Sequence, residues 1–215
     1  MAQESSSNLS QTATVPKGFR FSGVTCGIKA SGKPDLALVV GDGPLVAAGV
    51  YTTNQIVAAP VILCRQRTPS SRARAVVINS GNANACTGAQ GERDAEEMCK
   101  MVADHIGCDG SDVLVMSTGI IGRPLPMEKL RVGIADAVSK LADDHDAFTR
   151  ASTAIMTTDA FRKSIQRTTV IDGVTYCVAA MAKGAGMIAP NMATMLAVVV
   201  TDAPLNEQDV VEALR

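Results

Sequence analysis

The stretch KGAGMIAPNMATMLAVVV, residues 183–200, decides the fold around it. Its first half contains two glycines and Pro190, which is typical of a loop, and its second half is almost wholly apolar, which is typical of a buried strand. Thr194 lies where the two halves meet. Glycines allow the loop to adopt positive φ angles, and the strand after it would hold the threonine rigidly. Neither element by itself explains a threonine at this boundary.

The residues before this stretch predict a β-hairpin that leads directly into it. Residues 162–187 contain Asp172-Gly173, the strongest hairpin-turn signal in the chain. Before the hairpin, the helical spacing of apolar residues predicts one helix at 127–141. A second helix is expected after Asp144 or Asp146, ending at 157–159. The C-terminal part of the chain is thus predicted to run helix, helix, strand, strand, strand.

Two strands, each followed by a turn, are predicted further upstream. Residues 75–78 are apolar and predict a buried strand. A turn is predicted directly after it at 79–84, which is rich in side-chain amides. Residues 113–116 form another strand, which ends in a turn at 117–122. Between them, residues 90–107 have the spacing of an amphipathic helix.

The first third of the chain predicts strands joined by turns. Residues 16–40 alternate apolar and small residues, and Gly41-Asp42-Gly43-Pro44 predicts a strong turn. Residues 45–51 are a further strand candidate, and residues 57–64 fit either a strand or a short helix. Residues 1–15 form a polar stretch that we expect to be a disordered tail.

The order of these elements predicts one α/β or layered α+β domain, because no repeat or low-complexity linker divides the chain. Asn206 is a suitable N-cap for a last helix, and the chain stops before that helix has a C-cap signal. We therefore expect the sequence to be truncated, or to be one piece of a longer precursor.

The composition narrows the functional classes. The chain has 215 residues, of which 47% are hydrophobic and 19% charged, and it reads as globular and soluble. Its net charge is −1, and only 3% of residues are aromatic, with no tryptophan. A nucleic-acid partner or a membrane surface is therefore not expected. No stretch reaches the roughly 20 apolar residues of a membrane span, and the N-terminus does not resemble a secretory signal.

The cysteines and histidines predict neither a metal site nor Cys-His catalysis. The six cysteines contain no C-x-x-C pair, and there are only two histidines, so we expect no metal site. The cysteines suit reduced, mostly buried thiols of a cytoplasmic protein. Cys-His catalysis is disfavoured because neither His105 nor His145 lies in a glycine-rich or apolar context.

The position of Thr194 is compatible with self-cleavage of the chain. Its hydroxyl would attack the carbonyl of Ala193, a small residue that leaves the carbon accessible, and water would release Thr194 as a new N-terminus. The freed α-amine has a pKa of about 7.7–8.0 and can serve as general base for the adjacent hydroxyl. The alternative is a glycine-rich loop before an ordinary core strand, in which Thr194 only fills space. Local pattern leaves both interpretations open.

Acyl transfer also needs donors for an oxyanion and a partner for the substrate's charge. Thr118-Gly119 is the best candidate for the oxyanion hole, because a strand is expected to stop there and a flexible turn to begin. A plain strand-to-helix turn explains the same residues equally well. Lys183 can pair with a substrate carboxylate, although a lone lysine is more often a solvated surface charge.

Five motifs together resemble the ornithine acetyltransferase family, whose members are glutamate N-acetyltransferases with or without amino-acid N-acetyltransferase activity. The motifs are KGAGMIAPNMATML (183–196), STGIIG (117–122), VVINSGNANACTG (76–88), AIMTTD (154–159) and GVYTTN (49–54). By position, the resemblance implies cleavage between Ala193 and Thr194, with Thr194 as the nucleophile. It also implies that Thr118 and Gly119 form the oxyanion hole and that Thr157, Lys183 and Thr194 bind substrate.

The same resemblance implies the fold, the reaction and the assembly. The fold is a layered α/β structure of sheets flanked by helices, similar to N-terminal-nucleophile hydrolases. Residues 16–193 would be the α chain, and residues 194–215 would begin a β chain whose remainder, the C-terminal half, is missing here. Acetyl would pass from N-acetylornithine to glutamate through Thr194, without a cofactor and with acetyl-CoA as a further donor in some members. Two α and two β chains would assemble.

Three other functions are alternatives to this reaction. A self-processing aminopeptidase of the related superfamily would transfer the acyl group to water, although those enzymes favour a serine nucleophile. A dinucleotide enzyme is disfavoured because the G-x-G at 41–43 lacks the third small residue and is followed by Pro44. A non-catalytic relative would keep the fold and leave the chain uncut.

Overall fold

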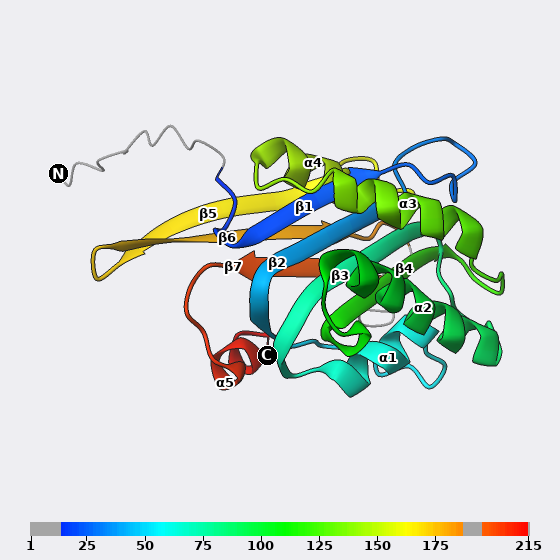
Figure 1. Cartoon of the computed structure of the whole chain (residues 1–215), viewed down its shortest axis with the longest axis horizontal. Coiled ribbons are helices and arrows are strands. Elements are labelled where there is room, and N and C mark those ends of the chain that lie inside the picture. Colours follow the sequence, from blue (N-terminus) through cyan, green and yellow to red (C-terminus); the bar gives the residue numbers. More distant parts are fainter. Residues whose placement is uncertain (1–13, 187–194, 215) are drawn as a thin grey trace.

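Two β-sheets form the framework of the protein. The computed structural model describes residues 14–186 and 195–214. The larger sheet has four strands in the order β1-β2-β3-β4, and only β3 and β4 run parallel. The smaller sheet is antiparallel, in the order β5-β6-β7 (Figure 1). The strands are β1 (Phe19–Val24), β2 (Leu36–Ala47), β3 (Ser70–Asn82), β4 (Val113–Ile120), β5 (Lys163–Ile171), β6 (Val174–Lys183) and β7 (Leu196–Thr201).

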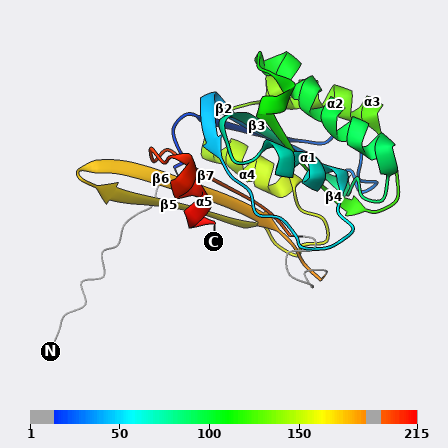
Figure 2. The same ribbon diagram turned by 90° about the horizontal axis from the view of Figure 1, so that it is seen from below.

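The helices and sheets are stacked in layers. Three helices, α1 (Ala59–Arg67), α2 (Gly88–Ile106) and α3 (Met127–Ser139), cover the outer face of the larger sheet. Helix α4 (His145–Ala154) lies between the larger and the smaller sheet, as the view along the layers shows (Figure 2). A 3₁₀ turn (Gly110–Asp112) precedes β4, and helix α5 (Glu207–Ala213) follows β7.

Strand β2 shows why the layers form. Leu36, Leu38 and Val40 belong to the core beneath the three outer helices, and Ala37 and Val39 belong to the core shared with α4 and the smaller sheet. Successive side chains of a strand point to opposite faces, so a continuous apolar run is buried on both sides. Each fully buried large aliphatic side chain stabilises the fold by about 1.5–3 kcal/mol relative to exposure.

Several sequence-based predictions are confirmed by these elements. The 162–187 hairpin forms as β5 and β6, and Asp172 and Gly173 both have positive φ (51° and 79°), as a two-residue hairpin turn requires. Helix α2 ends at Ile106 and is capped by Gly107, whose φ of 71° is left-handed. The side chain of Asp144 caps α4 by accepting from the backbone N–H of Ala147 at 2.6 Å.

Three predictions of local structure are wrong. Residues 41–44 are not a turn, because β2 continues through them to Ala47 with register shifts between Val40 and Leu45 and between Leu45 and Ala47. The amide-rich residues 79–82 are the last residues of β3, and residues 117–120 are the last residues of β4, because each strand supplies hydrogen-bond partners to the other. Glycines here mark irregular pairing rather than chain reversal.

Strand β7 differs from the buried strand that its sequence predicts. Leu196, Val198 and Val200 pack against the core between the sheets, but Val199 is 58% exposed on the other face. β7 is at one edge of the smaller sheet, so among the described residues it is paired on one side only. Residues 57–64, which fitted either element, belong to α1 and the loop before it. Within residues 14–186 and 195–214, no helix is long and apolar enough to cross a membrane.

Candidate active site

The site is built at the ends of the parallel strands β3 and β4. Their register places Ser80 opposite Thr118 and Gly81 opposite Gly119. The side chain of Asn79, next to this point, holds the two strand ends together. The Asn79 amide donates to the Asn82 carbonyl at 2.8 Å, and the Ser117 hydroxyl donates to the Asn79 side chain at 2.6 Å. The amides of the VVINSGNANACTG motif therefore fix the backbone around Thr118.

Lys183 joins the two sheets at this point. It is the last residue of β6, only 4% exposed, and its Nζ donates to Thr118 Oγ1 at 3.0 Å. A solvated surface lysine is therefore the wrong interpretation for this residue. Burial lowers the pKa of Lys183, and the neighbouring Asp159 carboxylate opposes that change. Because Thr118 Oγ1 accepts from the ammonium, its own hydroxyl hydrogen can be donated elsewhere.

Gly119 cannot be replaced by a larger residue without moving β3. Its φ is +136°, and a Cβ built there would lie 2.3 Å from the carbonyl carbon of Gly81 and 2.5 Å from the nitrogen of Asn82. The prediction that a strand stops before Thr118-Gly119 is wrong, since both residues belong to β4. A position fixed by strand pairing on one side suits a preorganised donor better than a flexible turn does.

A substitution at Gly119 tests this packing. Gly119→Ala is expected to lower the free energy of unfolding by about 1–3 kcal/mol from backbone strain, with further loss from the overlap with β3. Urea unfolding of the full-length protein measures the change. Gly32→Ala is the matched control, because Gly32 also has positive φ (+69°) but no atom within 4 Å of the added Cβ. Equal losses in the two variants would show that β3 does not crowd Gly119.

Thr157 lies on the segment between α4 and β5, where it is half-buried. Its backbone N–H donates to Asp159 Oδ2 at 3.1 Å, and Gly184, the residue after Lys183, donates to Asp159 Oδ1 at 2.9 Å. One carboxylate therefore ties the Thr157 segment to the end of β6. Thr118, Gly119, Lys183 and Thr157 are thus gathered from β4, β6 and the loop after α4.

Ala193 and Thr194, the predicted cleavage site, lie outside the described residues. The described chain resumes at Met195, and Leu196 pairs with Lys183 across β6 and β7. The residue that follows Thr194 by two positions is therefore the register partner of the buried lysine.

Sequence patterns did not identify two charged residues of this region. Asp159 is the last residue of the AIMTTD motif, and Lys29 lies in the loop between β1 and β2, with its Nζ 3.4 Å from the Ala154 carbonyl. The hydroxyl of Ser80 donates to that same carbonyl at 2.5 Å. Nothing in the local pattern distinguishes Asp159 from an ordinary loop aspartate, since its partners lie up to 25 residues away.

Cysteine chemistry is not supported by the described residues. Burial raises the pKa of both Cys26 and Cys99 to about 12, so neither is a thiolate nucleophile at neutral pH. All six cysteines are free thiols; Cys64, Cys99 and Cys177 are buried, and Cys86 is exposed. The part of the chain that the structure describes contains no group of three or more His, Cys, Asp or Glu residues that could hold a metal ion.

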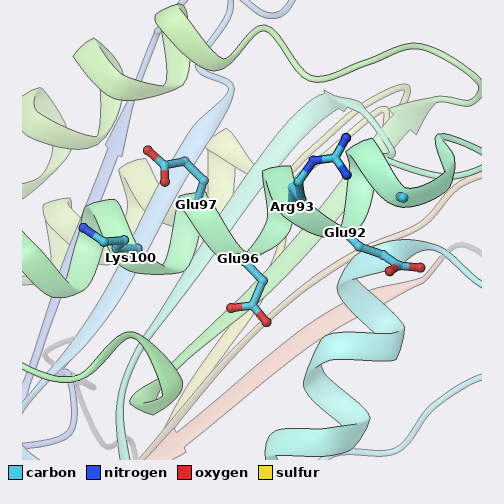
Figure 3. Close-up of a pocket in the computed structure, with 6 residues that line it drawn as sticks. Glu92, Arg93, Glu96, Glu97 and Lys100 are labelled. Atoms are coloured by element: carbon cyan, nitrogen blue, oxygen red, sulfur yellow. The ribbon is translucent and has the colours of Figure 1, made fainter.

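A hollow on α2 is unrelated to this site (Figure 3). All of its lining residues come from that one helix, and none comes from the strand ends that carry Thr118 and Lys183. It is an open, charged helix surface, where Lys100 pairs with Asp104 and Glu97 with Arg131. The lining residues are Ala89, Glu92, Arg93, Glu96, Glu97 and Lys100.

The layered fold places the protein in a structural class with N-terminal-nucleophile hydrolases. The structure of L-aminopeptidase D-Ala-esterase/amidase from Ochrobactrum anthropi, described as a variant of that fold, aligns with a TM-score of 0.52. It covers 92% of this chain and 64% of its own, at 14% identity, so the likeness concerns the fold alone.

The particular family follows from closer relatives. The ArgJ family model matches residues 20–215, and the chain belongs to that family. An arginine biosynthesis bifunctional protein ArgJ from Rhodopirellula baltica is 61% identical over 89% of this chain and 47% of its own length. The counterpart from Geobacter sulfurreducens is 55% identical over 89% of this chain and 48% of its own. The chain therefore spans about half the length of the curated relatives it matches.

Solved structures agree with this assignment. ArgJ from Bacillus halodurans aligns with a TM-score of 0.78 at 35% identity, covering 86% of this chain and 95% of that chain. Ornithine acetyltransferase from Mycobacterium tuberculosis, solved in complex with ornithine, aligns with a TM-score of 0.75 at 42% identity and the same coverage. The predicted family and the predicted α/β fold are both confirmed.

Proposed function

We propose that the full-length protein transfers acetyl from N-acetylornithine to glutamate in arginine biosynthesis, through an acetyl ester on Thr194. The observation that carries this proposal is the 3.0 Å hydrogen bond from buried Lys183 to Thr118. It joins two candidate site residues that lie 65 positions apart and come from different sheets. Family membership and the ornithine complex of the Mycobacterium tuberculosis relative support the same reaction.

The first chemical step is self-cleavage. The Thr194 hydroxyl oxygen attacks the Ala193 carbonyl carbon, the C–N bond breaks, and the hydroxyl proton is transferred to the departing nitrogen. This leaves an ester between Ala193 and Thr194. Water hydrolyses that ester, which gives a carboxylate on Ala193 and a free α-amine on Thr194. The amine is then the general base for the adjacent hydroxyl, so no histidine is needed.

Acetyl transfer follows in two half-reactions. The Thr194 oxygen attacks the acetyl carbonyl of N-acetylornithine, the amide C–N bond breaks, and the hydroxyl proton passes through the α-amine to the leaving nitrogen of ornithine. The α-amine of glutamate then attacks the acetyl ester, its proton returns to the Thr194 oxygen, and N-acetylglutamate leaves. No water is consumed in either half-reaction.

The residues of the described site have distinct roles in these steps. The Thr118 hydroxyl and the Gly119 backbone N–H would donate to the oxyanion that forms at each attacked carbonyl. The Lys183 ammonium holds Thr118 Oγ1 and supplies positive charge for a substrate carboxylate. Thr157 would contact the substrate from the loop after α4. Each role needs a donor that is already in place, which a buried and hydrogen-bonded site provides.

No cofactor is needed, and acetyl-CoA is a second acetyl donor to be tested. Residues 16–193 would be the α chain and residues 194–215 the start of the β chain, in an assembly of two α and two β chains. We place the protein in the cytoplasm, with neither nucleic acid nor membrane as a partner.

One assay tests the activity. Full-length protein is incubated with N-acetylornithine and glutamate, and in parallel with acetyl-CoA and glutamate, and N-acetylglutamate is measured. We expect N-acetylglutamate and ornithine to form in equal amounts in the first reaction. The fold it shares with the Ochrobactrum anthropi aminopeptidase makes a hydrolase the second candidate. Release of acetate at the same rate without glutamate would favour the hydrolase.

A further inference from the structure

The carboxylate of Asp159 is buried near the site and accepts three hydrogen bonds. Its side chain is only 1% exposed. Oδ1 accepts from Lys163 Nζ at 2.7 Å and from the Gly184 backbone N–H at 2.9 Å. Oδ2 accepts from the Thr157 backbone N–H at 3.1 Å. Both oxygens are therefore occupied by donors from three different segments.

Two of these three segments carry candidate substrate-binding residues, and the third is the start of β5. Thr157 is itself a donor, Gly184 is the residue after Lys183, and Lys163 begins β5. Hydrogen bonds to an ionised carboxylate are shorter and about twice as strong as neutral ones. A small change at Asp159 would therefore move Thr157 and the end of β6 relative to each other.

We propose that Asp159 is a positioning residue, which fixes the Thr157 loop against the end of β6 and keeps a negative charge beside Lys183. This inference rests on the proposed function, because it assumes that Thr157 and Lys183 bind substrate. Asp159 acts through these neighbours and has no assigned contact with the reacting atoms.

The charges around Lys183 allow this role to be separated from simple structural support. Asp159 raises the pKa of Lys183 and Lys163 lowers it, while burial, the largest influence, lowers it. Lys29 is a further cation in this region, and its own pKa is lowered mainly by burial and slightly by Lys183. Although burial alone would raise the pKa of Asp159, the bonds from Lys163, Gly184 and Thr157 lower it to about 2. Asp159 is therefore ionised throughout the pH range in which such an enzyme works.

The protonation state of Lys183 sets the direction of the pH effect. Lys183 must be protonated to hold Thr118 and a carboxylate, so activity falls as pH rises through the pKa of Lys183. Removing the Asp159 charge lowers that pKa. The alkaline limb of the pH profile, where kcat/KM declines, then moves to lower pH. Removing Lys163 raises that pKa and moves the limb to higher pH. Opposite shifts from two residues that form one ion pair are not expected from a loss of packing.

The test uses full-length Asp159→Asn and Lys163→Met, with N-acetylornithine and glutamate as substrates over a range of pH. Asp159→Asn is expected to lower kcat/KM at least about tenfold through misplacement of the site, and to shift the alkaline limb of the pH profile to lower pH. Lys163→Met keeps the bonds from Thr157 and Gly184. It is expected to stay within roughly fivefold of wild type and to shift the limb up.

Wild-type kcat/KM and an unshifted profile in Asp159→Asn would overturn the positioning role while leaving the proposed function intact. If Asp159→Asn does not fold, judged by thermal melting, Asp159→Glu decides, because it keeps the charge and displaces the carboxylate: a lowered kcat/KM supports the positioning role, and wild-type kcat/KM rejects it. If wild type transfers no acetyl, the proposed function fails, and the pH dependence of self-cleavage in the same variants tests Asp159 by the same criterion.

Discussion

Thr194→Ala is expected to leave the full-length precursor as one uncut chain and to lower acetyl transfer by at least about 10⁴-fold. The variant lacks the hydroxyl that would attack the Ala193 carbonyl, and without cleavage it also lacks the free α-amine that would serve as base. Nucleophile and base are therefore lost in one substitution. A denaturing gel shows whether the chain is cut, and N-acetylglutamate formation measures the transfer.

Thr194→Ser is the matched control for that variant, because it keeps the hydroxyl and removes only a methyl group. It should still give two chains and measurable transfer. Residual turnover near the wild-type rate in Thr194→Ala would refute the assigned nucleophile. If the wild-type precursor remains uncut and transfers no acetyl, the protein is instead the non-catalytic relative.

Lys183→Met is expected to lower kcat/KM by about 10²–10³-fold, equivalent to a loss of 3–4 kcal/mol. The variant leaves Thr118 Oγ1 without its buried donor and leaves the substrate carboxylate without a counter-charge. The loss should appear mainly as a raised KM for both substrates, since both carry a carboxylate. Steady-state kinetics with N-acetylornithine and with glutamate measure it.

Two controls accompany this variant. Lys140→Met removes an exposed lysine at the end of α3 whose ammonium pairs with Asp136, and it should leave the kinetics unchanged. Lys183→Arg keeps the charge but not the compact ammonium, so we expect it to recover part of the binding. A wild-type KM in Lys183→Met would show that this lysine does not bind the substrate.

The elements that sequence patterns predicted correctly are those whose cause is local. The Asp172-Gly173 turn needs two residues of positive φ, and the α2 helix needs an apolar face and a terminal glycine, all of which lie within one segment. The errors at 79–82 and 117–120 have one cause: glycine and asparagine indicated turns, but β3 and β4 pair with each other there. At 41–44 the chain continues in β2 through an irregularity in its pairing with β3.

The same difference between local and long-range causes applies to the site. Thr118, Gly119 and Lys183 were singled out from their local sequence, and the family resemblance added Thr157. The contact between Lys183 and Thr118 could not be predicted, because it depends on how the two sheets pack. Asp159 was missed because its donors, Thr157, Lys163 and Gly184, are backbone or charged groups that only the folded chain brings to one carboxylate.

The most direct test of the central claim is mass spectrometry of mature, active full-length protein after brief exposure to N-acetylornithine without glutamate. The account predicts two chains, divided between Ala193 and Thr194, with one acetyl group on the side chain of Thr194. An intact Ala193–Thr194 bond in active protein, or an acetyl ester on any other residue, would contradict it.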